Sequence, residues 1–224
     1  MVTGKSYDFS TVKGISANQL KQHYKLYEGY IKKYNEISSI LKSNKNLGEP
    51  NATYSEIRSL KLGESYALDG IKLHELYFEN LTGTHRPPSG IILDMIIKRF
   101  GSYSRFIQLL KDVALSMRGW AILAIDPIDN DLHIFGLDAH DVGAVWEACP
   151  LLVLDVYEHA YMIDFGIDRK KYIDIFIENI NWDVVNSRIT KYLKANSRYD
   201  EEAYSTHPCR FSPPPFCPFM EAYK

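Results

Sequence analysis

The chain has 224 residues, of which 46% are hydrophobic and 24% are charged, and its formal net charge at pH 7 is -2. This composition predicts a globular protein large enough for one or two cores, and the near-neutral charge without a basic stripe argues against bulk nucleic-acid binding. No apolar signal segment opens the chain and no apolar run approaches the about 20 residues that span a bilayer, so a cytoplasmic protein without a membrane partner is expected.

The N-terminal part of the sequence predicts two helices. Apolar and aromatic residues recur every three or four positions over residues 16–42, with Ser16 as a suitable N-cap. A second helical pattern covers residues 53–81, after a polar break rich in Asn, Gly and Pro. Two helices joined by a short polar loop form an antiparallel hairpin.

The hydrophobic period changes twice in the second half. Two helical patterns, residues 91–100 and 103–117, precede a predicted β-hairpin, a buried third strand and two further helices. The strands are expected at residues 120–125, 132–135 and 151–154, and the last helices at 170–180 and 183–195. This order predicts an α+β fold, in which an N-terminal antiparallel helical hairpin precedes an α/β domain with a three-stranded antiparallel sheet flanked by helices.

Three segments follow from this pattern. We expect a helical-hairpin domain over residues 1–84, an α+β domain over 90–196, and a tail over 197–224 that is rich in Pro and Cys and has neither period. A proline-rich arm that docks on a neighbour is the expected form of the tail. Zinc binding through His207, Cys209 and Cys217, or crosslinking between chains, is the alternative.

Four residues are candidate metal ligands. Asp155 and His159 directly follow the apolar run of residues 151–154, where a carboxylate and an imidazole are costly to bury unless a cation binds them. His23 and His74 lie on the two N-terminal helical patterns. Three imidazoles and one carboxylate suit iron, manganese or zinc better than calcium or copper(I).

Each candidate has a simpler interpretation when it is taken alone. His23 could be a hydrogen-bonded helix residue among tyrosines, and Asp155 with His159 could form a structural hydrogen bond at the end of a strand. Only the joint pattern favours a mononuclear redox metal site.

Several phrases of the sequence carry a family resemblance. The phrase D-V-Y-E-H-A-Y from Asp155 is close to the signature D-x-W-E-H-A-Y, and N-W-D-V-V from Asn181 resembles the motif N-W-x-x-V. The stretches around His23 and His74 match those that hold the first two metal histidines of the same family. Over residues of about 7–195 the chain therefore resembles the iron/manganese superoxide dismutases.

The resemblance implies a metal site and an activity. One Fe or Mn ion per chain, with a water or hydroxide as fifth ligand, is expected to convert superoxide to dioxygen and hydrogen peroxide by alternate reduction and oxidation. The implied ligands are His23, His74, Asp155 and His159. Iron and manganese share these donors, so both metals remain open.

The resemblance also implies three catalytic residues around the ligands. His140 falls where many members carry a glutamine bonded to the metal-bound solvent, and Gly70 leaves room for it. Tyr30 resembles the tyrosine of the substrate gate, although Ile31 takes that place unless one residue is deleted after the first ligand. Arg169 fits an arginine that attracts superoxide at the funnel mouth. His140 as a loop histidine and Arg169 as a helix-flanking residue are the alternatives.

The predicted partner is a second copy of the chain. Glu158 matches a glutamate that reaches the metal histidine of the other subunit, which implies a homodimer or a tetramer. Three departures from the family pattern predict an altered entrance: Tyr157 replaces a tryptophan, Met162 replaces a gateway tyrosine, and Tyr27 stands near the place of its histidine partner.

Two other functions are alternatives to a superoxide dismutase. A structural or assembly protein on the same fold could keep the metal for stability and use the tail for association. A non-heme iron oxygenase with two histidines and a carboxylate predicts only three ligands and a cosubstrate pocket, so a fourth donor argues against it.

Overall fold

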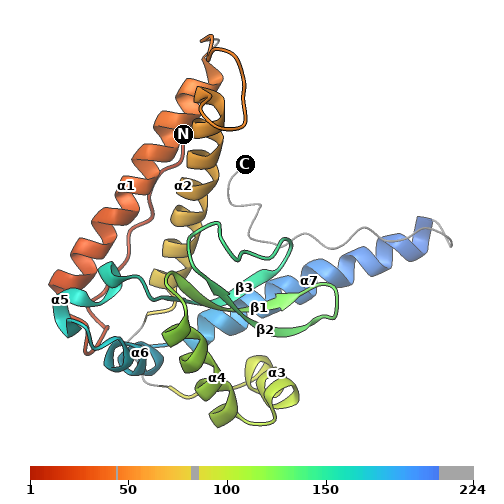
Figure 1. Ribbon diagram of the computed structural model, residues 1–224. Coiled ribbons are helices and arrows are strands. Elements are labelled where there is room, and N and C mark those ends of the chain that lie inside the picture. The colour runs from red at the N-terminus through yellow and green to blue at the C-terminus, as the bar shows by residue number, and fades with distance from the viewer. Residues whose placement is uncertain (44, 82–85, 207–224) are drawn as a thin grey trace.

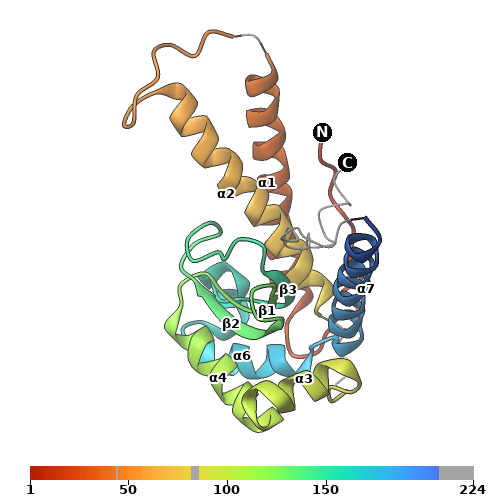
Figure 2. The ribbon, with the colours of Figure 1, turned by 90° about the vertical axis from the view of Figure 1, so that its right-hand side faces the viewer.

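Two long helices pack together as an antiparallel hairpin at the N-terminal end of the computed structural model, which describes residues 1–43, 45–81 and 86–206. They are α1, Ala17–Lys42, and α2, Glu56–Glu79. As predicted, Ser16 caps α1, because its side chain accepts a hydrogen bond from the backbone N–H of Gln19. The far end of the hairpin projects beyond the rest of the molecule (Figures 1 and 2).

The sheet domain contains three antiparallel strands in the order β2-β1-β3. They are β1, Trp120–Asp126; β2, Asp131–Leu137; and β3, Cys149–Asp155. Every residue of the central strand β1 is buried, and its register places Trp120 opposite Asp155. The last residue of β3 therefore lies deep in the fold, against an aromatic side chain of the central strand.

Helices cover the sheet and connect it to the hairpin. Helices α2 and α7 pack against β3, whereas α3 and α4 pack against β2 (Figure 2). Two short elements, η1 and α5, follow β3 and contact α1. The elements outside the hairpin and the sheet are α3, Ile91–Phe100; α4, Tyr103–Ser116; η1, Glu158–Ala160; α5, Met162–Phe165; α6, Arg169–Glu178; and α7, Trp182–Thr206. None of the helices in the described ranges has the length and apolar character needed to cross a membrane.

A buried arginine connects α7 to β3 and to the end of α2 by hydrogen bonds. Arg188 of α7 is 2% exposed, and its guanidinium donates hydrogen bonds to two side chains and two backbone carbonyls. The acceptors are Asn80 Oδ1 at 3.1 Å, Leu151 O at 2.7 Å, Leu76 O at 3.1 Å and Glu79 Oε2 at 2.8 Å. Because these acceptors belong to β3 and to the C-terminal end of α2, one side chain holds the two elements in register.

The structure confirms the predicted fold class, with differences at the ends of elements. Strands β1 and β2 are longer than predicted, and η1 and α5 were not predicted. Helix α7 continues to Thr206, so the expectation of irregular structure from residue 197 is wrong as far as residue 206. The predicted zinc or crosslinking residues His207, Cys209 and Cys217 lie outside the described residues, and the predicted domain limits stay predictions.

Candidate metal centre

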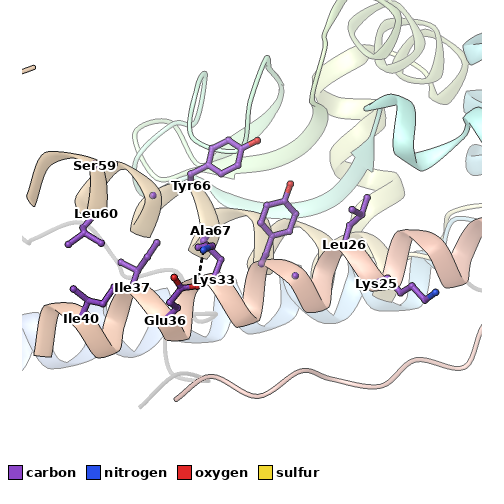
Figure 3. Close-up of a pocket in the computed structure, with 13 residues that line it drawn as sticks. Lys25, Leu26, Lys33, Glu36, Ile37, Ile40, Ser59, Leu60, Tyr66 and Ala67 are labelled. Carbon is purple, nitrogen blue, oxygen red and sulfur yellow. Dashed lines mark hydrogen bonds and ion pairs between the residues drawn. The ribbon is translucent and has the colours of Figure 1, made fainter. Parts of the chain in front are cut away.

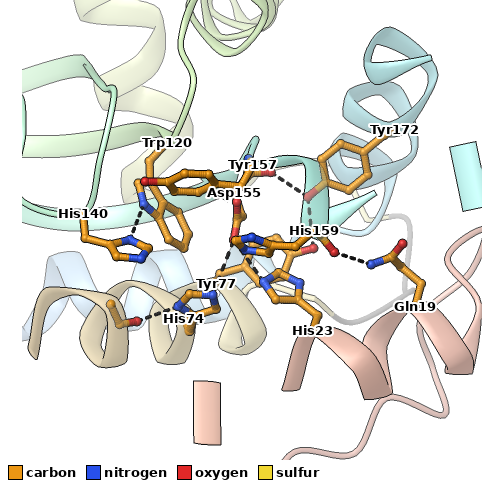
Figure 4. Close-up of polar contacts among 11 residues, drawn as sticks. Gln19, His23, His74, Tyr77, Trp120, His140, Asp155, Tyr157, His159 and Tyr172 are labelled. Atoms are coloured by element: carbon orange, nitrogen blue, oxygen red, sulfur yellow. Dashed lines mark hydrogen bonds and ion pairs between the residues drawn. The ribbon is translucent and has the colours of Figure 1, made fainter. Parts of the chain in front are cut away.

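Four side chains from separate parts of the fold converge where the hairpin meets the sheet domain (Figure 4). They are His23 of α1, His74 of α2, Asp155 at the end of β3 and His159 of η1. One ligand atom from each residue lies within 4.8 Å of the others. The first three residues are buried, whereas the side chain of His159 is 24% exposed. The structure thus brings together all four residues that the sequence singled out as ligands.

Local hydrogen bonds aim the Asp155 carboxylate at the three histidines. Its Oδ1 accepts from the backbone N–H of Tyr157 at 2.9 Å, and its backbone carbonyl accepts from the Tyr172 hydroxyl at 2.8 Å. Its Oδ2 is left to face the imidazoles. It lies 3.0 Å from His23 Nε2, 3.1 Å from His159 Nε2 and 3.7 Å from His74 Nε2.

Gln19 connects α1 to the turn that carries His159. Its Nε2 donates to the backbone carbonyl of His159 at 2.6 Å, and its Oε1 accepts from the backbone N–H of Ile163 at 3.0 Å. Gln19 is fully buried, so its amide group needs both of these partners. The position of His159 is therefore fixed relative to α1, which carries His23.

The spacing of the four ligand atoms fits a single bound ion. Donors about 2.1 Å from one ion, with angles of 90° to 120° between them, lie about 3.0 to 3.6 Å apart. The three measured distances from Asp155 Oδ2 fall in or next to this range. Burial disfavours the charged carboxyl, but the imidazoles of His159 and His23 outweigh this and hold the pKa of Asp155 well below its usual range, so the carboxylate is ionised.

His74 presents a buried nitrogen lone pair that a cation would satisfy. Its Nδ1 donates to the backbone carbonyl of Gly70 at 2.6 Å, which leaves Nε2 with a lone pair in the neutral ring. Burial lowers the pKa of His74 well below its usual value, so the ring stays neutral. Nε2 has no hydrogen-bond partner among the described residues and faces Asp155 Oδ2, a second acceptor. Two buried acceptors that face each other repel, and a cation between them satisfies both.

His140 supplies a buried donor beside the four candidate ligands. The indole N–H of Trp120 can only donate, and it donates to His140 Nδ1 at 3.0 Å, so the proton of the neutral ring is on Nε2. Burial lowers the pKa of His140 to about 4, which keeps the ring neutral near pH 7. Nε2 is buried and has no partner among the described residues. The ring thus offers one N–H to a small molecule at the site.

Gly70 makes room for two of the predicted residues. A Cβ at this position would lie 3.1 Å from the Tyr30 ring and 3.3 Å from His140 Cδ2. Both side chains therefore fill the space that was predicted for His140 alone. Tyr30 lies seven residues after His23 in an unbroken helix, which places both on one side of α1, whereas Ile31 is turned away by about 100°.

Tyr66 borders the site and was not predicted. Its ring centroid is 4.5 Å from that of His140 and 6.1 Å from that of Tyr30. The signal was present in the spacing, because Tyr66 lies four residues before Gly70 and eight before His74, on the same side of α2. Tyr157, which stands where the family pattern has a tryptophan, stacks on His159 with centroids 5.1 Å apart.

Two further predicted residues lie away from the ligand atoms. The Arg169 guanidinium donates to the Tyr161 hydroxyl at 3.2 Å and to the backbone carbonyl of Met117 at 2.8 Å. Arg169 lines a cavity of about 390 Å³ together with Glu158 and Met162. Tyr27 is buried on the side of the hairpin that faces the N-terminal segment, where its hydroxyl donates to Glu75 at 2.8 Å and accepts from the backbone N–H of Lys5 at 2.9 Å.

Comparison with known proteins agrees with this donor set. The family model described as iron/manganese superoxide dismutases, C-terminal domain, matches residues 88–188. The chain is 43% identical over 189 residues to a protein of Aquifex pyrophilus named superoxide dismutase [Fe], covering 82% of this chain and 88% of that protein. It is 42% identical to the Aquifex aeolicus protein of the same name, with the same coverage, and 32% identical over 185 residues to superoxide dismutase [Mn] 1 of Halobacterium salinarum, covering 81% and 90%. The chain belongs to the iron/manganese superoxide dismutase family.

Proposed function

We propose that the protein is a superoxide dismutase, which converts two superoxide ions and two protons to dioxygen and hydrogen peroxide. One Fe or Mn ion per chain, held by His23, His74, Asp155 and His159, supplies the alternating one-electron reduction and oxidation. The observation that carries this proposal is the pair of buried acceptors, His74 Nε2 and Asp155 Oδ2, which face each other 3.7 Å apart.

In the proposed reaction, His140 and Tyr30 provide hydrogen-bond donors beside the metal. Trp120 fixes the His140 tautomer, so that the Nε2–H of His140 can hydrogen-bond a small oxygen species that enters the site. The half-buried Tyr30 packs on the rings of His74 and His140 with centroids 5.3 and 4.9 Å away. Burial raises the pKa of Tyr30, so its hydroxyl stays protonated and available as a donor. We assign proton handling to His140 and Tyr30.

Arg169 has a different proposed role. It lies outside the ligand cluster, in the cavity that also contains the exposed Glu158. A cation near the entrance raises the local concentration of a small anion such as superoxide, even on a chain with a slight negative charge. We propose that Arg169 attracts the substrate without touching the metal.

The same cavity supports a homodimer. Three apolar side chains beside it are exposed: Met162 at 43%, Ile163 at 50% and Ile167 at 94%. A second copy of the chain would remove these apolar surfaces from water. In the proposed dimer, Glu158 of one protomer reaches the partner's His159, whose side chain is 24% exposed in the single chain. Sedimentation should show a dimer for the wild type and a monomer for Ile167→Glu, and a monomeric wild type would contradict this assembly.

Activity measurements on metal-loaded protein test the proposed function. Iron- and manganese-loaded samples should each be tested for inhibition of cytochrome c reduction by superoxide, with metal content measured on the same preparations. We expect the wild type to bind about one ion per chain and to dismutate superoxide with at least one of the two metals. His74→Ala and Asp155→Ala should each lose both the bound ion and the activity. His133→Ala is a matched control, because His133 pairs with Asp129 at 3.0 Å on the surface of the sheet domain. If the metal-loaded wild type leaves cytochrome c reduction unchanged, the protein is a structural member of the family.

A further inference from the structure

A groove on the hairpin reaches two tyrosines that pack beside the candidate metal centre. It lies between α1 and α2, has a volume of about 610 Å³, and is lined in part by Lys33, Ile37 and Leu60 (Figure 3). Tyr30 and Tyr66 also line the groove. The ring of each of these tyrosines also packs on His140. Each tyrosine therefore lies between the groove and the metal centre.

Three tyrosines surround the His140 ring, and we call them the phenol triad: Tyr30, Tyr66 and Tyr157. Their ring centroids lie 4.9, 4.5 and 5.3 Å from that of His140. Burial, and after it the neighbouring Tyr66, raises the pKa of Tyr30 and that of Tyr157. Tyr66 is thus the central member of the triad. It is also the most accessible one, with 36% of its surface exposed, whereas the other two are partly buried.

We propose that Tyr66 is a positioning residue for proton delivery, which connects the hairpin groove through Tyr30 to the metal centre. This inference rests on the proposed dismutation, because that reaction consumes two protons for each peroxide formed. Tyr66 touches neither His74 nor any other proposed ligand, so it acts through Tyr30.

The path works without any change in the net charge of a phenol. A hydroxyl can accept a proton from one neighbour while it releases its own to the next. Solvent in the groove gives a proton to Tyr66, Tyr66 passes its own to Tyr30, and Tyr30 passes its own to the peroxide product. Two passages supply the two protons, and each phenol ends the cycle neutral.

The variant Tyr66→Phe isolates the hydroxyl, because it keeps the ring that packs on His140. We expect kcat to fall by about 3- to 10-fold, less than the about 100-fold or more that a directly positioned acid contributes, since water can still deliver protons. The encounter with superoxide is unaffected, so kcat/KM stays within about twofold of the wild-type value. A small buffer acid such as imidazolium should restore kcat, and the solvent deuterium isotope effect on kcat should increase.

Three comparisons separate a relay from a structural role. Metal content and the dissociation constant of azide, followed by the visible absorption of the iron-loaded form, should be unchanged in Tyr66→Phe. The double variant Tyr30→Phe/Tyr66→Phe should lose no more activity than Tyr30→Phe alone, because both act in one path. Tyr24→Phe is the matched control, since it also loses a phenol hydrogen bond of the hairpin, to the backbone carbonyl of Lys5 at 2.9 Å.

Each other outcome overturns the inference. An unchanged kcat in Tyr66→Phe means that the hydroxyl carries no protons. An equal loss in kcat and kcat/KM, without rescue by imidazolium and with an altered azide affinity, means that Tyr66 only holds His140 in place. If the metal-loaded wild type fails to dismutate superoxide, the proposed function fails and the relay falls with it, whereas an active wild type with an unaffected variant rejects the relay alone.

Discussion

Replacing Gly70 by alanine tests whether the space beside α2 is reserved for the side chains of the metal centre. The new methyl group would lie 3.1 Å from the Tyr30 ring and 3.3 Å from His140 Cδ2, closer than side chains normally pack. Neither neighbour can retreat freely. Tyr30 packs on His74, and His140 accepts a hydrogen bond from Trp120. The substitution should therefore disturb both proposed catalytic residues.

Two opposing effects set the size of the change in stability. Alanine is better than glycine in a helix interior by about 0.8 to 1.0 kcal/mol. Overpacking of a filled site costs about 1 to 3 kcal/mol. We expect a net loss of about 1 kcal/mol for Gly70→Ala, which lowers the midpoint of thermal unfolding by about 2 to 4 °C in a chain of this size. Activity should fall at the same time, because Tyr30 and His140 must move by a few tenths of an ångström.

Circular dichroism melting of the metal-loaded protein, with a dismutation assay on the same samples, measures both effects. The control for stability is Gly29→Ala, which lies inside α1 and whose added methyl group meets no atom within 4 Å. It should gain about 1 kcal/mol, because only the helix propensity changes. If Gly70→Ala melts as high as Gly29→Ala and keeps full activity, the space beside Gly70 is not reserved and this account of the site is wrong.

Three further predictions concern the surroundings of the ligands. Burial lowers the pKa of His140 to about 4, against about 6.5 when unfolded, so the unfolded chain binds more protons between these values and stability falls as pH drops through this window. Urea unfolding of metal-free protein should show a flatter pH profile for His140→Gln, and an unchanged profile would contradict the assignment. Trp120→Phe removes the donor to His140 Nδ1 and should lower kcat/KM by about 10-fold or more with metal retained; full activity would exclude this role. Arg188→Met leaves buried acceptors without a donor and should lower the free energy of unfolding, measured in urea, by about 3 to 5 kcal/mol. A decrease below about 1 kcal/mol would show that Arg188 does not hold α2, β3 and α7 together.

The sequence predicted the hairpin from a local signal, whereas the four candidate ligands were favoured by their joint pattern and by the family resemblance of the phrases around them. Helical spacing is strong in α1 and α2, and a carboxylate and an imidazole directly after an apolar strand are unusual. The seven-residue spacing between His23 and Tyr30 also predicts that the two share one side of a regular helix. In contrast, the contact of Tyr66 with His140 depends on how the hairpin packs on the sheet domain, which no local pattern contains.

Errors at element ends have separate physical causes. The third strand is predicted from the apolar run of residues 151–154 alone, whereas β3 begins at Cys149. Because β3 is an edge strand, Pro150 is tolerated where it pairs with Ala124 at a register shift. The end of α7 was missed because residues 197–206 contain many charged and polar residues without an apolar stripe. The elements η1 and α5 are too short to show a period.

The most direct test of the account is anomalous X-ray diffraction from crystals of the metal-loaded protein, recorded at the iron and manganese absorption edges. The account predicts one anomalous peak per chain, within bonding distance of Nε2 of His23, His74 and His159 and of Oδ2 of Asp155. A metal-loaded crystal with no peak among these four atoms, or with its only peak elsewhere, would contradict the proposed metal centre.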